Sequence, residues 1–569
     1  MKLTLITGRT IGQGRSVEDK LAGKYRDAVS TVFLDKSDME KLGVKEGDRV
    51  KVSTSTGEAI LRVSASRFSQ QGIAFIPMGP YANLLLPYET EGSGMPCLKN
   101  VEAEVAKATG EILDVQGILQ VYGVQGTITP EDYKPADGKS YTVEDAVCSF
   151  CGCLCDDLTV KVENGVIARV EKACSIGRAK LENHWRGRLL KPYVRQDGVM
   201  KPVSLEEALE KAAEILTNSN YPLLYGWSNT TVQAMRVGYE LAELLGGVID
   251  NTTSVCHGPT ILGVMNVGTV RATLGQLRNQ ADLLVYWGCN PLEAHQRQYE
   301  RYGATSKGFK IKSRSDRKVV VVDVRETLTA RTADLHLRVQ PGGDYNLITA
   351  LRMAIRDYEI ERDQVAGVPV EEIYKLADVM RSCRFGVLYF GVGATMTTGK
   401  ELLIEALVRL VQDLNEWTKF ALQPLRGHYN VSGACQTSLW TTGYAFGVDY
   451  MRGYPRHNAS ITTAVELLAN RDVDAALIIA SDPVAHFPAE AVRGLLEIPV
   501  IAIDSKVSLT VASSTVAIPS ALSGVEVEGT AYRMDGVALH LKKIVQPPPQ
   551  VLGDEEILKR LLEKVRSGR

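Results

Sequence analysis

The stretch Cys148-Ser149-Phe150-Cys151-Gly152-Cys153-Leu154-Cys155, with Cys174 beyond it, gives the spacing C-x2-C-x3-C-x18-C. Thiolates are the ligands of iron-sulfur clusters, and four in this order can enclose a single cluster. Structural zinc is the alternative, because four cysteine thiolates also bind zinc. Zinc ribbons usually pair two short C-x2-C knuckles, whereas one knuckle here is stretched to three cysteines. The candidate metal ligands are Cys148, Cys151, Cys155 and Cys174.

A separate cysteine follows about eighty residues later, in Ser254-Val255-Cys256-His257-Gly258-Pro259. An isolated thiolate beside a histidine indicates a second metal ligand at Cys256, although a lone cysteine is more often an ordinary buried residue. The remaining cysteines are expected to be small buried hydrophobic residues: Cys97, Cys153, Cys289, Cys383 and Cys435.

The composition limits the classes of function. The chain has 569 residues, 45% of them hydrophobic, and a formal net charge of -2 from 65 basic and 67 acidic residues. This composition predicts a large globular protein. It lacks the excess of basic residues expected of a protein that binds nucleic acid or an anionic membrane. No run is long enough to span a bilayer. Ten cysteines without an export signal predict a cytoplasmic protein whose cysteines bind metal instead of forming disulfides.

Residues 1–126 contain short alternating segments such as Arg49-Val50-Lys51-Val52 and Gly72-Ile73-Ala74-Phe75-Ile76-Pro77. Short strands at this spacing, separated by turn signals, predict a closed or nearly closed β-barrel. Residues 127–141 contain Pro130, Pro135, Asp137 and Gly138 and predict a linker.

After a cysteine-rich segment at 142–200, residues 201–545 repeat an apolar strand, a glycine-rich turn and a helix. Leu283-Leu284-Val285-Tyr286-Trp287-Gly288 and Val319-Val320-Val321-Val322-Asp323 are examples. Such repeats predict an α/β fold with doubly wound parallel sheets, in two layered domains that share a cleft. Residues 546–569 are expected to form a C-terminal helix or tail.

Polar and glycine-rich turns follow several of these strands. Ligands of doubly wound sheets lie beyond the carboxyl ends of the strands, where loop amides and helix N-termini favour phosphate. An acidic residue directly after a strand suits the base or ribose of a nucleotide, and two such sets suggest two nucleotide-bearing groups. The candidates are Asn290, Asp323, Arg325, Gly342, Asp344, Gly393, Ser481, Asp482 and Asp504.

Together these motifs resemble those of the molybdenum and tungsten bis-pterin oxidoreductases, the dimethyl sulfoxide reductase superfamily that includes formate dehydrogenases. The resemblance runs from residue 147 to about residue 532. Besides both cysteine motifs, it is carried by Thr329-Ala330-Arg331-Thr332-Ala333-Asp334-Leu335-His336 with Pro341-Gly342-Gly343-Asp344, by Arg426-Gly427-His428-Tyr429-Asn430-Val431-Ser432-Gly433-Ala434, and by Glu528-Gly529-Thr530-Ala531-Tyr532-Arg533.

The N-terminal domain resembles the double-psi β-barrel that closes over the pterin cofactor of those enzymes, where it lies at the C-terminus. Thr7-Gly8-Arg9 and Gly94-Met95-Pro96-x2-Lys99 carry this likeness. In formylmethanofuran dehydrogenases of methane-producing archaea, the barrel is a separate small subunit. The chain is therefore similar to a fusion of that subunit, placed first, with the catalytic subunit.

The resemblance implies two-electron reduction of carbon dioxide to formate, or its reverse. A tungsten or molybdenum ion would be held by two molybdopterin guanine dinucleotides, a terminal sulfido ligand and Cys256, and one 4Fe-4S cluster by the four spaced cysteines. His257 and Arg331 would be catalytic neighbours of the metal, the guanidinium binding formate and the imidazole relaying a proton. Besides the residues after the strands, the implied cofactor contacts are Thr7, Arg9, Pro80, Asn83, Lys99, Arg426 and His428.

Two positions depart from the family pattern. Cys153 has no counterpart in the family spacing, so its side chain is expected to point away from the cluster. Formate dehydrogenases often have a lysine two positions after the fourth cluster cysteine, where this chain has Ile176. The role of that lysine is therefore not carried over, although Lys180 is nearby in the sequence.

Three functions stay open: a carbon dioxide-reducing subunit of formylmethanofuran dehydrogenase, a stand-alone formate dehydrogenase, and a degenerate iron-sulfur scaffold. The domain order argues against the second, and Cys256, His257 and Arg331 argue against the third. The chain has no His-x-His element for condensing formate with methanofuran, so that reaction would belong to a partner. The implied partners are an amidohydrolase subunit, a β-helical subunit and polyferredoxin-type subunits.

Overall fold

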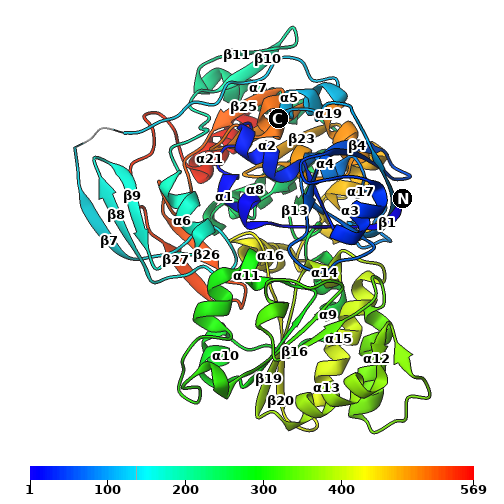
Figure 1. Cartoon of the computed structure of the whole chain (residues 1–569). Coiled ribbons are helices and arrows are strands. Elements are labelled where there is room, and N and C mark those ends of the chain that lie inside the picture. Colours follow the sequence, from blue (N-terminus) through cyan, green and yellow to red (C-terminus); the bar gives the residue numbers. More distant parts are fainter. Residues whose placement is uncertain (136–137, 569) are drawn as a thin grey trace.

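The computed structural model describes residues 1–135 and 138–568 (Figure 1). Positions 136 and 137 of the expected linker, including Asp137, therefore lie outside the described residues. Figure 1 shows the N-terminal barrel beside one α/β unit, with a second α/β unit below them. Within the described ranges, no helix has both the length and the apolar character needed to cross a membrane.

The N-terminal domain is a closed barrel with strand order β1-β5-β2-β4-β3-β6, as expected from its alternating segments. In β3, Val50 and Val52 are fully buried while Arg49 and Lys51 are exposed, so alternate residues fill the barrel. The strands are β1 (Lys2–Gly8), β2 (Thr31–Leu34), β3 (Arg49–Ser53), β4 (Glu58–Ala65), β5 (Ile73–Pro77) and β6 (Lys99–Lys107). The helices of this region are α1 (Ile11–Ser16), α2 (Gly23–Val29), α3 (Lys36–Leu42), α4 (Pro80–Asn83) and α5 (Val115–Val121).

A three-stranded antiparallel sheet carries the cysteine-rich segment. It consists of β7 (Tyr141–Ala146), β8 (Leu158–Glu163) and β9 (Val166–Glu171), followed by α6 (Ser175–Glu182). Three of the four spaced cysteines lie in the loop between β7 and β8, and Cys174 caps the N-terminus of α6. The hairpin of β26 (Gly529–Tyr532) and β27 (Ala538–Leu541) packs on the loop, since the Met534 amide donates to the Gly152 carbonyl at 2.9 Å.

The larger sheet has the order β11-β10-β25-β24-β23-β12-β13-β21-β22. Its centre, from β25 to β13, is parallel, while both edges are antiparallel hairpins. The expected parallel sheet is thus extended at each edge by a short hairpin. The strands are β10 (Tyr193–Gln196), β11 (Val199–Pro202), β12 (Pro222–Gly226), β13 (Val248–Asn251), β21 (Val448–Asp449), β22 (Arg456–His457), β23 (Ala475–Ile479), β24 (Val500–Asp504) and β25 (Val516–Pro519).

The second sheet is parallel throughout, with the order β16-β15-β14-β19-β20. The strands are β14 (Leu283–Trp287), β15 (Lys318–Asp323), β16 (Leu335–Arg338), β19 (Phe385–Phe390) and β20 (Lys419–Pro424). A two-stranded hairpin of β17 (Gln364–Val365) and β18 (Val368–Pro369) lies outside both sheets.

Helices cover both faces of the larger sheet, which explains why its strands are apolar along their whole length. One face packs against α7 (Leu205–Asn218), α8 (Val232–Leu245) and α21 (Asp554–Gly568), and the other against α17 (Ala464–Asn470), α19 (Ala489–Leu496) and α20 (Leu509–Ser513). The five-stranded sheet packs against α12 (Asp344–Ile355), α13 (Val370–Ser382) and α15 (Lys400–Leu414) on one face. Its other face packs against the cysteine-rich segment, α10 (Leu274–Gln280) and the π-helix η1 (Gln298–Tyr302).

The remaining elements lie around the ends of the sheets. They are α9 (Gly258–Val267), α11 (Pro291–Ala294), α14 (Val392–Thr395), α16 (Val431–Thr442), α18 (Pro483–His486) and the 3-10 turns η2 (Arg314–Asp316) and η3 (Ala330–Thr332). The α/β class with doubly wound sheets and an N-terminal barrel is confirmed. The C-terminal segment, which we expected to be a helix or tail, contains α21.

Candidate functional site

The strand order of each parallel sheet reverses at one point, where close backbone approach requires glycine. In the five-stranded sheet this point lies between β14 and β19, and a Cβ atom on Gly393 would lie 2.3 Å from the Gly288 carbonyl oxygen. In the larger sheet it lies between β12 and β23. Gly226 there has a φ of 125°, and a Cβ would lie 2.1 Å from the Ile479 carbonyl oxygen. Ligands of doubly wound sheets bind at such points.

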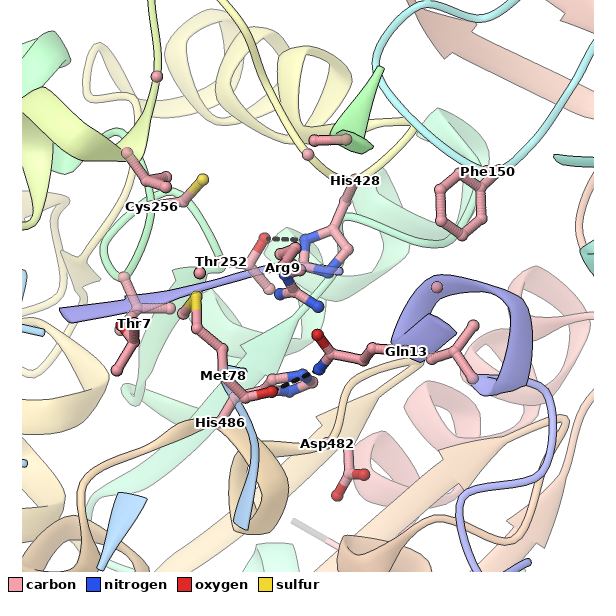
Figure 2. Close-up of a pocket in the computed structure, with 18 of the residues that line it drawn as sticks. Thr7, Arg9, Gln13, Met78, Phe150, Thr252, Cys256, His428, Asp482 and His486 are labelled. Atoms are coloured by element: carbon pink, nitrogen blue, oxygen red, sulfur yellow. Dashed lines mark hydrogen bonds between the residues drawn. The ribbon is translucent and has the colours of Figure 1, made fainter. Parts of the chain in front are cut away.

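Loops from both points line one cavity of about 430 Å³ (Figure 2). Barrel residues and Phe150 of the cysteine-rich loop complete its wall. The structure therefore brings residues from four distant parts of the chain to a single site. The predicted residues that line it are Thr7, Arg9, Lys99, Cys256, Asn290, Asp323, Arg325, Gly342, Asp344, Gly393, His428, Ser481, Asp482 and Asp504.

Other predicted residues do not line this cavity: Pro80, Asn83, His257, Arg331 and Arg426. Pro80 and Asn83 belong to α4, which is buried and packs against α18, whose Pro483 and His486 do line the cavity. The two α4 residues are therefore one layer behind the wall. The Asn83 side-chain nitrogen has no hydrogen-bond partner although it is buried, so the structure leaves its donor unused.

Cys256 lies in the cavity wall, in the turn between β13 and α9. The Cys256 amide donates to the Thr253 carbonyl at 3.0 Å, and the Cys256 carbonyl accepts from the Thr395 hydroxyl at 2.7 Å. Burial raises the pKa of the thiol, while the Arg426 guanidinium and the Gly427 amide oppose that shift. A bound metal cation would instead lower the pKa of this thiol, because a coordinating thiol loses its proton.

His257 is fully buried beside Cys256, and both of its ring nitrogens have partners. Nε2 lies 3.3 Å from the Leu425 carbonyl oxygen, and Nδ1 lies 3.0 Å from the Thr260 hydroxyl. Since a carbonyl only accepts, Nε2 carries the proton and Nδ1 accepts from the hydroxyl. Burial and the Arg426 charge lower the pKa of His257 to about 3. The neutral ring therefore packs behind Cys256 without reaching the cavity.

The structure does not bring Arg331 to Cys256. Its side chain is 58% exposed, lies 3.9 Å from the Glu326 carboxylate and stacks over Phe68. The reason is local, because η3 is a one-turn helix at the surface that directs this side chain outward. The catalytic role expected for Arg331 therefore has no geometric support.

Arg426, unlike Arg331, lies close enough to Cys256 for its charge to act on the thiol. It lies two residues after β20 and is 6% exposed. Nη1 donates to the Cys435 sulfur at 3.3 Å, while Nε is buried without a partner. An unpaired buried guanidinium donor is costly unless a ligand accepts from it. The motif that contains Arg426 was recognisable in the sequence, but it indicated only a cofactor contact.

The acidic residues at the ends of strands line the cavity, where Asp482 is buried and Asp323 and Asp504 are partly buried. Burial raises the pKa of Asp504 to about 6 and also raises that of Asp323. Burial likewise lowers the pKa of Lys99 to about 8. Asp482 is paired instead, with Lys20 Nζ at 2.7 Å from Oδ2. No local pattern in the sequence singled out Lys20, which lies between α1 and α2.

The thiols of Cys148 and Cys174 lie close together, and Cys148 and Cys151 are near enough to raise the pKa of Cys155. A Cβ on Gly177 would lie 3.0 Å from the Cys148 sulfur and 3.6 Å from the Cys174 sulfur. Burial raises the pKa of Cys148, Cys155 and Cys174, so the thiols keep their protons until a metal replaces them. As they stand, no three Cys, His, Asp or Glu side chains among the described residues are arranged to hold a metal ion. The donor chemistry nevertheless fits an iron-sulfur cluster.

Cys153 does not point away from this group as we expected. It is 1% exposed, and its thiol hydrogen-bonds to that of Cys151, which raises the pKa of Cys151. The two cysteines meet because the loop folds tightly here, with the Leu154 amide bonded to the Cys151 carbonyl at 3.0 Å. The side chains of Cys151 and Cys153, which are separated by Gly152, then lie on the same side of the turn.

Comparison with known families gives two matches along the chain. Residues 3–102 match the Molydopterin dinucleotide binding domain, and residues 188–564 match Molybdopterin oxidoreductase. The first match falls on the barrel and the second on both α/β units.

Two relatives and one solved structure extend these matches. One subunit of the tungsten-containing formylmethanofuran dehydrogenase 2 of Methanocaldococcus jannaschii is 48% identical over 429 residues, which cover 74% of this chain and 98% of that protein. Protein FwdD of the same organism is 42% identical over 128 residues, covering 21% of this chain and 94% of that protein. The formyltransferase/hydrolase complex FhcABCD from Methylorubrum extorquens contains a chain with a similar fold, at a TM-score of 0.55 and 24% identity, covering 66% of this chain and 99% of that one.

Proposed function

Because the chain belongs to the formylmethanofuran dehydrogenase family, within the molybdopterin oxidoreductases, we propose that it interconverts carbon dioxide and formate at a tungsten or molybdenum bis-pterin centre. The observation that carries this proposal is the convergence of Cys256, both strand-reversal points and the barrel on one cavity. Protein FwdD and the tungsten-containing relative are separate proteins, and this chain unites matches to both.

We assign two molybdopterin guanine dinucleotides to the site because it has two strand-reversal points. Asp323 and Asp504 each end a strand near one of these points and suit a ribose or a guanine base, while Arg9 and Arg325 offer charge to phosphates. Cys256 is the protein ligand of the metal, which would also carry a terminal sulfido ligand. When bound, this centre supplies the two-electron chemistry, and the protein supplies ligation, orientation and charge.

The protein groups around Cys256 then have distinct tasks. Arg426 does not itself line the cavity, but its neighbours Leu425 and Gly427 do, its charge acts on the Cys256 thiol, and its buried Nε has no partner, which leaves a donor that suits the carboxylate of formate. His257 stays neutral and holds the Leu425 carbonyl and Thr260, so it fixes the turn that carries Cys256. We therefore assign substrate binding to Arg426 and positioning to His257, and assign no catalytic role to Arg331.

The spaced cysteines would hold one 4Fe-4S cluster that exchanges single electrons with the metal centre. Phe150, between Cys148 and Cys151, lines the cavity, as does Ile176, two residues after Cys174. The cysteine-rich loop and the start of α6 therefore both adjoin the cofactor cavity. An adjacent cluster is what the two-electron reaction requires if electrons arrive singly.

The formate made here would pass to an amidohydrolase partner that formylates methanofuran. A β-helical subunit and polyferredoxin-type subunits would complete the complex. The names of the similar proteins support an assembly of several subunits, since one is a subunit of a dehydrogenase and another belongs to a formyltransferase/hydrolase complex.

The test is viologen-coupled formate oxidation by the purified full chain loaded with tungsten or molybdenum. We expect formate oxidation by the chain alone, and formylation of methanofuran only after an amidohydrolase partner is added. A loaded chain that holds its cluster yet neither oxidises formate nor reduces carbon dioxide would contradict the proposal.

A further inference from the structure

A short chain of hydrogen bonds joins Arg426 to the turn that carries Cys256. The Cys256 amide donates to the Thr253 carbonyl at 3.0 Å. The Thr253 hydroxyl oxygen lies 2.9 Å from the sulfur of Cys435, a residue of α16, and Arg426 Nη1 donates to the same sulfur at 3.3 Å. Cys435 therefore contacts both the turn of the proposed metal ligand and the proposed substrate-binding arginine.

The chemistry of these groups gives each hydrogen bond its direction. A guanidinium has donors only, so the Cys435 sulfur accepts from Arg426. The thiol proton of Cys435 then points to the Thr253 hydroxyl oxygen, which accepts it. One thiol thus serves two neighbours at once, as the acceptor for the arginine and the donor to the threonine.

The surroundings of Cys435 make this contact matter. Cys435 is buried, as expected from the sequence, and packs with Ala445, Phe446 and Ala459, whose side chains have no hydrogen-bonding group. Sulfur is a weak acceptor, but a buried charged donor that loses its partner pays the full cost of desolvation. Without the thiol, a second nitrogen of the Arg426 guanidinium would be buried without a partner, besides Nε.

Holding Nη1 also orients the rest of the Arg426 side chain. The guanidinium is planar and rigid, so the position of Nη1 restricts the direction in which Nε can donate. Nε is the donor without a protein partner, and the flanking residues Leu425 and Gly427 line the cavity. The contact with Cys435 therefore helps to decide where the unpaired donor of Arg426 lies relative to Cys256.

We propose that Cys435 is a positioning residue, which holds the Arg426 guanidinium at a fixed place relative to the Cys256 turn by bonding to Thr253. This inference rests on the proposed function, since formate is the ligand that Arg426 is oriented to bind. Cys435 itself neither touches the substrate nor changes in the reaction. Without its thiol, Arg426 keeps the positive charge but loses its fixed orientation, so formate binds more weakly because binding must then also order the guanidinium.

The experiment compares Cys435→Ala with Cys435→Ser in the full chain at equal metal and guanine-nucleotide content. Isothermal titration calorimetry measures the Kd for formate on the chemically reduced chain, which cannot oxidise it, and viologen-coupled oxidation gives KM and kcat. We expect Cys435→Ala to raise the Kd and the KM about tenfold, the effect of one hydrogen bond, and to leave kcat within about twofold. Serine also donates and accepts at this place, so Cys435→Ser should restore a Kd within about threefold of that of the unmodified chain.

Thr253→Val removes the same contact from the other side. Valine has no hydroxyl, so the Cys435 thiol loses one partner while the Thr253 carbonyl still accepts from the Cys256 amide. We expect the Kd for formate to rise about threefold. Because both variants act through one chain of hydrogen bonds, the double variant with Cys435→Ala should bind formate no more weakly than Cys435→Ala alone. Losses that simply add would contradict a shared chain.

Ser438→Ala is the matched control. Ser438 lies about one helical turn after Cys435 on α16, is fully buried and donates to the Tyr444 carbonyl at 2.6 Å, so its loss loosens the same helix without touching Arg426. We expect its Kd and KM to be unchanged. Unchanged formate binding in Cys435→Ala, an equal loss in Cys435→Ser, or an equal shift in Ser438→Ala would overturn the inference alone. An unmodified chain that holds its metal but binds no formate would overturn the proposed function, and this inference with it.

Discussion

Replacing Arg426 by lysine tests the substrate-binding assignment most sharply. Lysine keeps the positive charge but loses the planar fork that binds a carboxylate through two parallel hydrogen bonds. Arg426 is 6% exposed, and while its Nη1 donates to the Cys435 sulfur, its Nε has no protein partner, so Nε is the donor left for the substrate. One hydrogen bond to a charged group contributes about 2 kcal/mol, which predicts a loss of about 30-fold in kcat/KM.

Arg331→Lys is the matched control for this variant. The Arg331 side chain is 58% exposed and its partner Glu326 lies 3.9 Å away, a surface ion pair worth less than about 1 kcal/mol. Viologen-coupled formate oxidation at equal metal loading should therefore leave Arg331→Lys within about twofold of the unmodified chain. A normal rate in Arg426→Lys with a large loss in Arg331→Lys would refute the assignment of substrate binding to Arg426.

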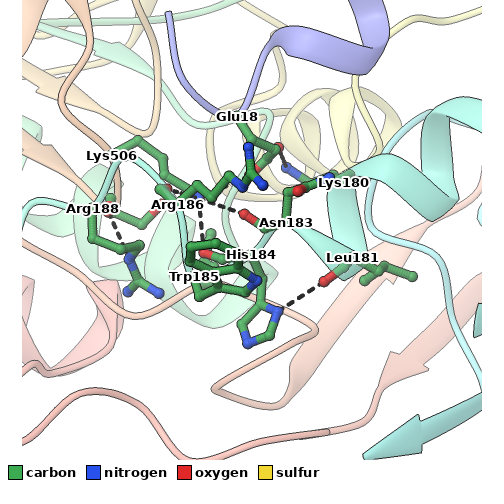
Figure 3. Close-up of polar contacts among 12 residues, drawn as sticks. Glu18, Lys180, Leu181, Asn183, His184, Trp185, Arg186, Arg188 and Lys506 are labelled. Atoms are coloured by element: carbon green, nitrogen blue, oxygen red, sulfur yellow. Dashed lines mark hydrogen bonds and ion pairs between the residues drawn. The ribbon is translucent and has the colours of Figure 1, made fainter. Parts of the chain in front are cut away.

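Three further predictions concern the cluster, the barrel and acid stability. Cys174→Ser should lower the iron content, whereas Cys153→Ser should leave it unchanged; equal iron loss in both would show that the ligand set is wrong. Residues 142–569 expressed alone should retain pterin poorly, because Thr7, Arg9 and Lys99 of the cavity wall are missing, and full pterin retention would contradict this. Glu18 has its pKa lowered from 4.5 to about 2, so its ion pairs stabilise the folded chain fully above about pH 4.5 and are lost as the pH falls toward 2. In acid unfolding, Glu18→Gln should flatten the dependence of the free energy of unfolding on pH across that window. An unaltered profile would count against the ion pairs of Glu18 with Lys180 and Lys506 (Figure 3).

The residues that follow strands were predictable because two local signals coincide there. Near-continuous apolar runs mark buried parallel strands, and a polar or glycine residue directly after such a run must lie at the carboxyl edge of the sheet. Asp323, Asp482 and Asp504 were identified in this way, and all three line the cavity.

Side-chain direction was less predictable from sequence. Arg331 and Arg426 both lie in family-like segments, but η3 points one outward while the end of β20 buries the other. A short motif states which residues are present, not which way a one-turn helix directs them. The same limit explains Cys153, whose thiol meets Cys151 only because of the tight loop between them.

Contacts between distant segments left no local signal at all. Lys20 pairs with Asp482, and Glu18 pairs with Lys180 and Lys506, although 462 and 162 residues separate the first two of these pairs. These contacts form because the barrel packs on the rest of the chain. No hydrophobic period or residue spacing in the sequence indicates where that packing occurs. The part of the site that depends on the fused barrel was therefore the part that required the structure.

Metal and nucleotide analysis of the purified full chain is the decisive measurement for the bis-pterin assignment. We expect tungsten or molybdenum together with iron in the ratio of one 4Fe-4S cluster, and guanine nucleotide released on denaturation. Zinc in place of iron, or a chain that contains the cluster but neither tungsten, molybdenum nor guanine nucleotide, would contradict it.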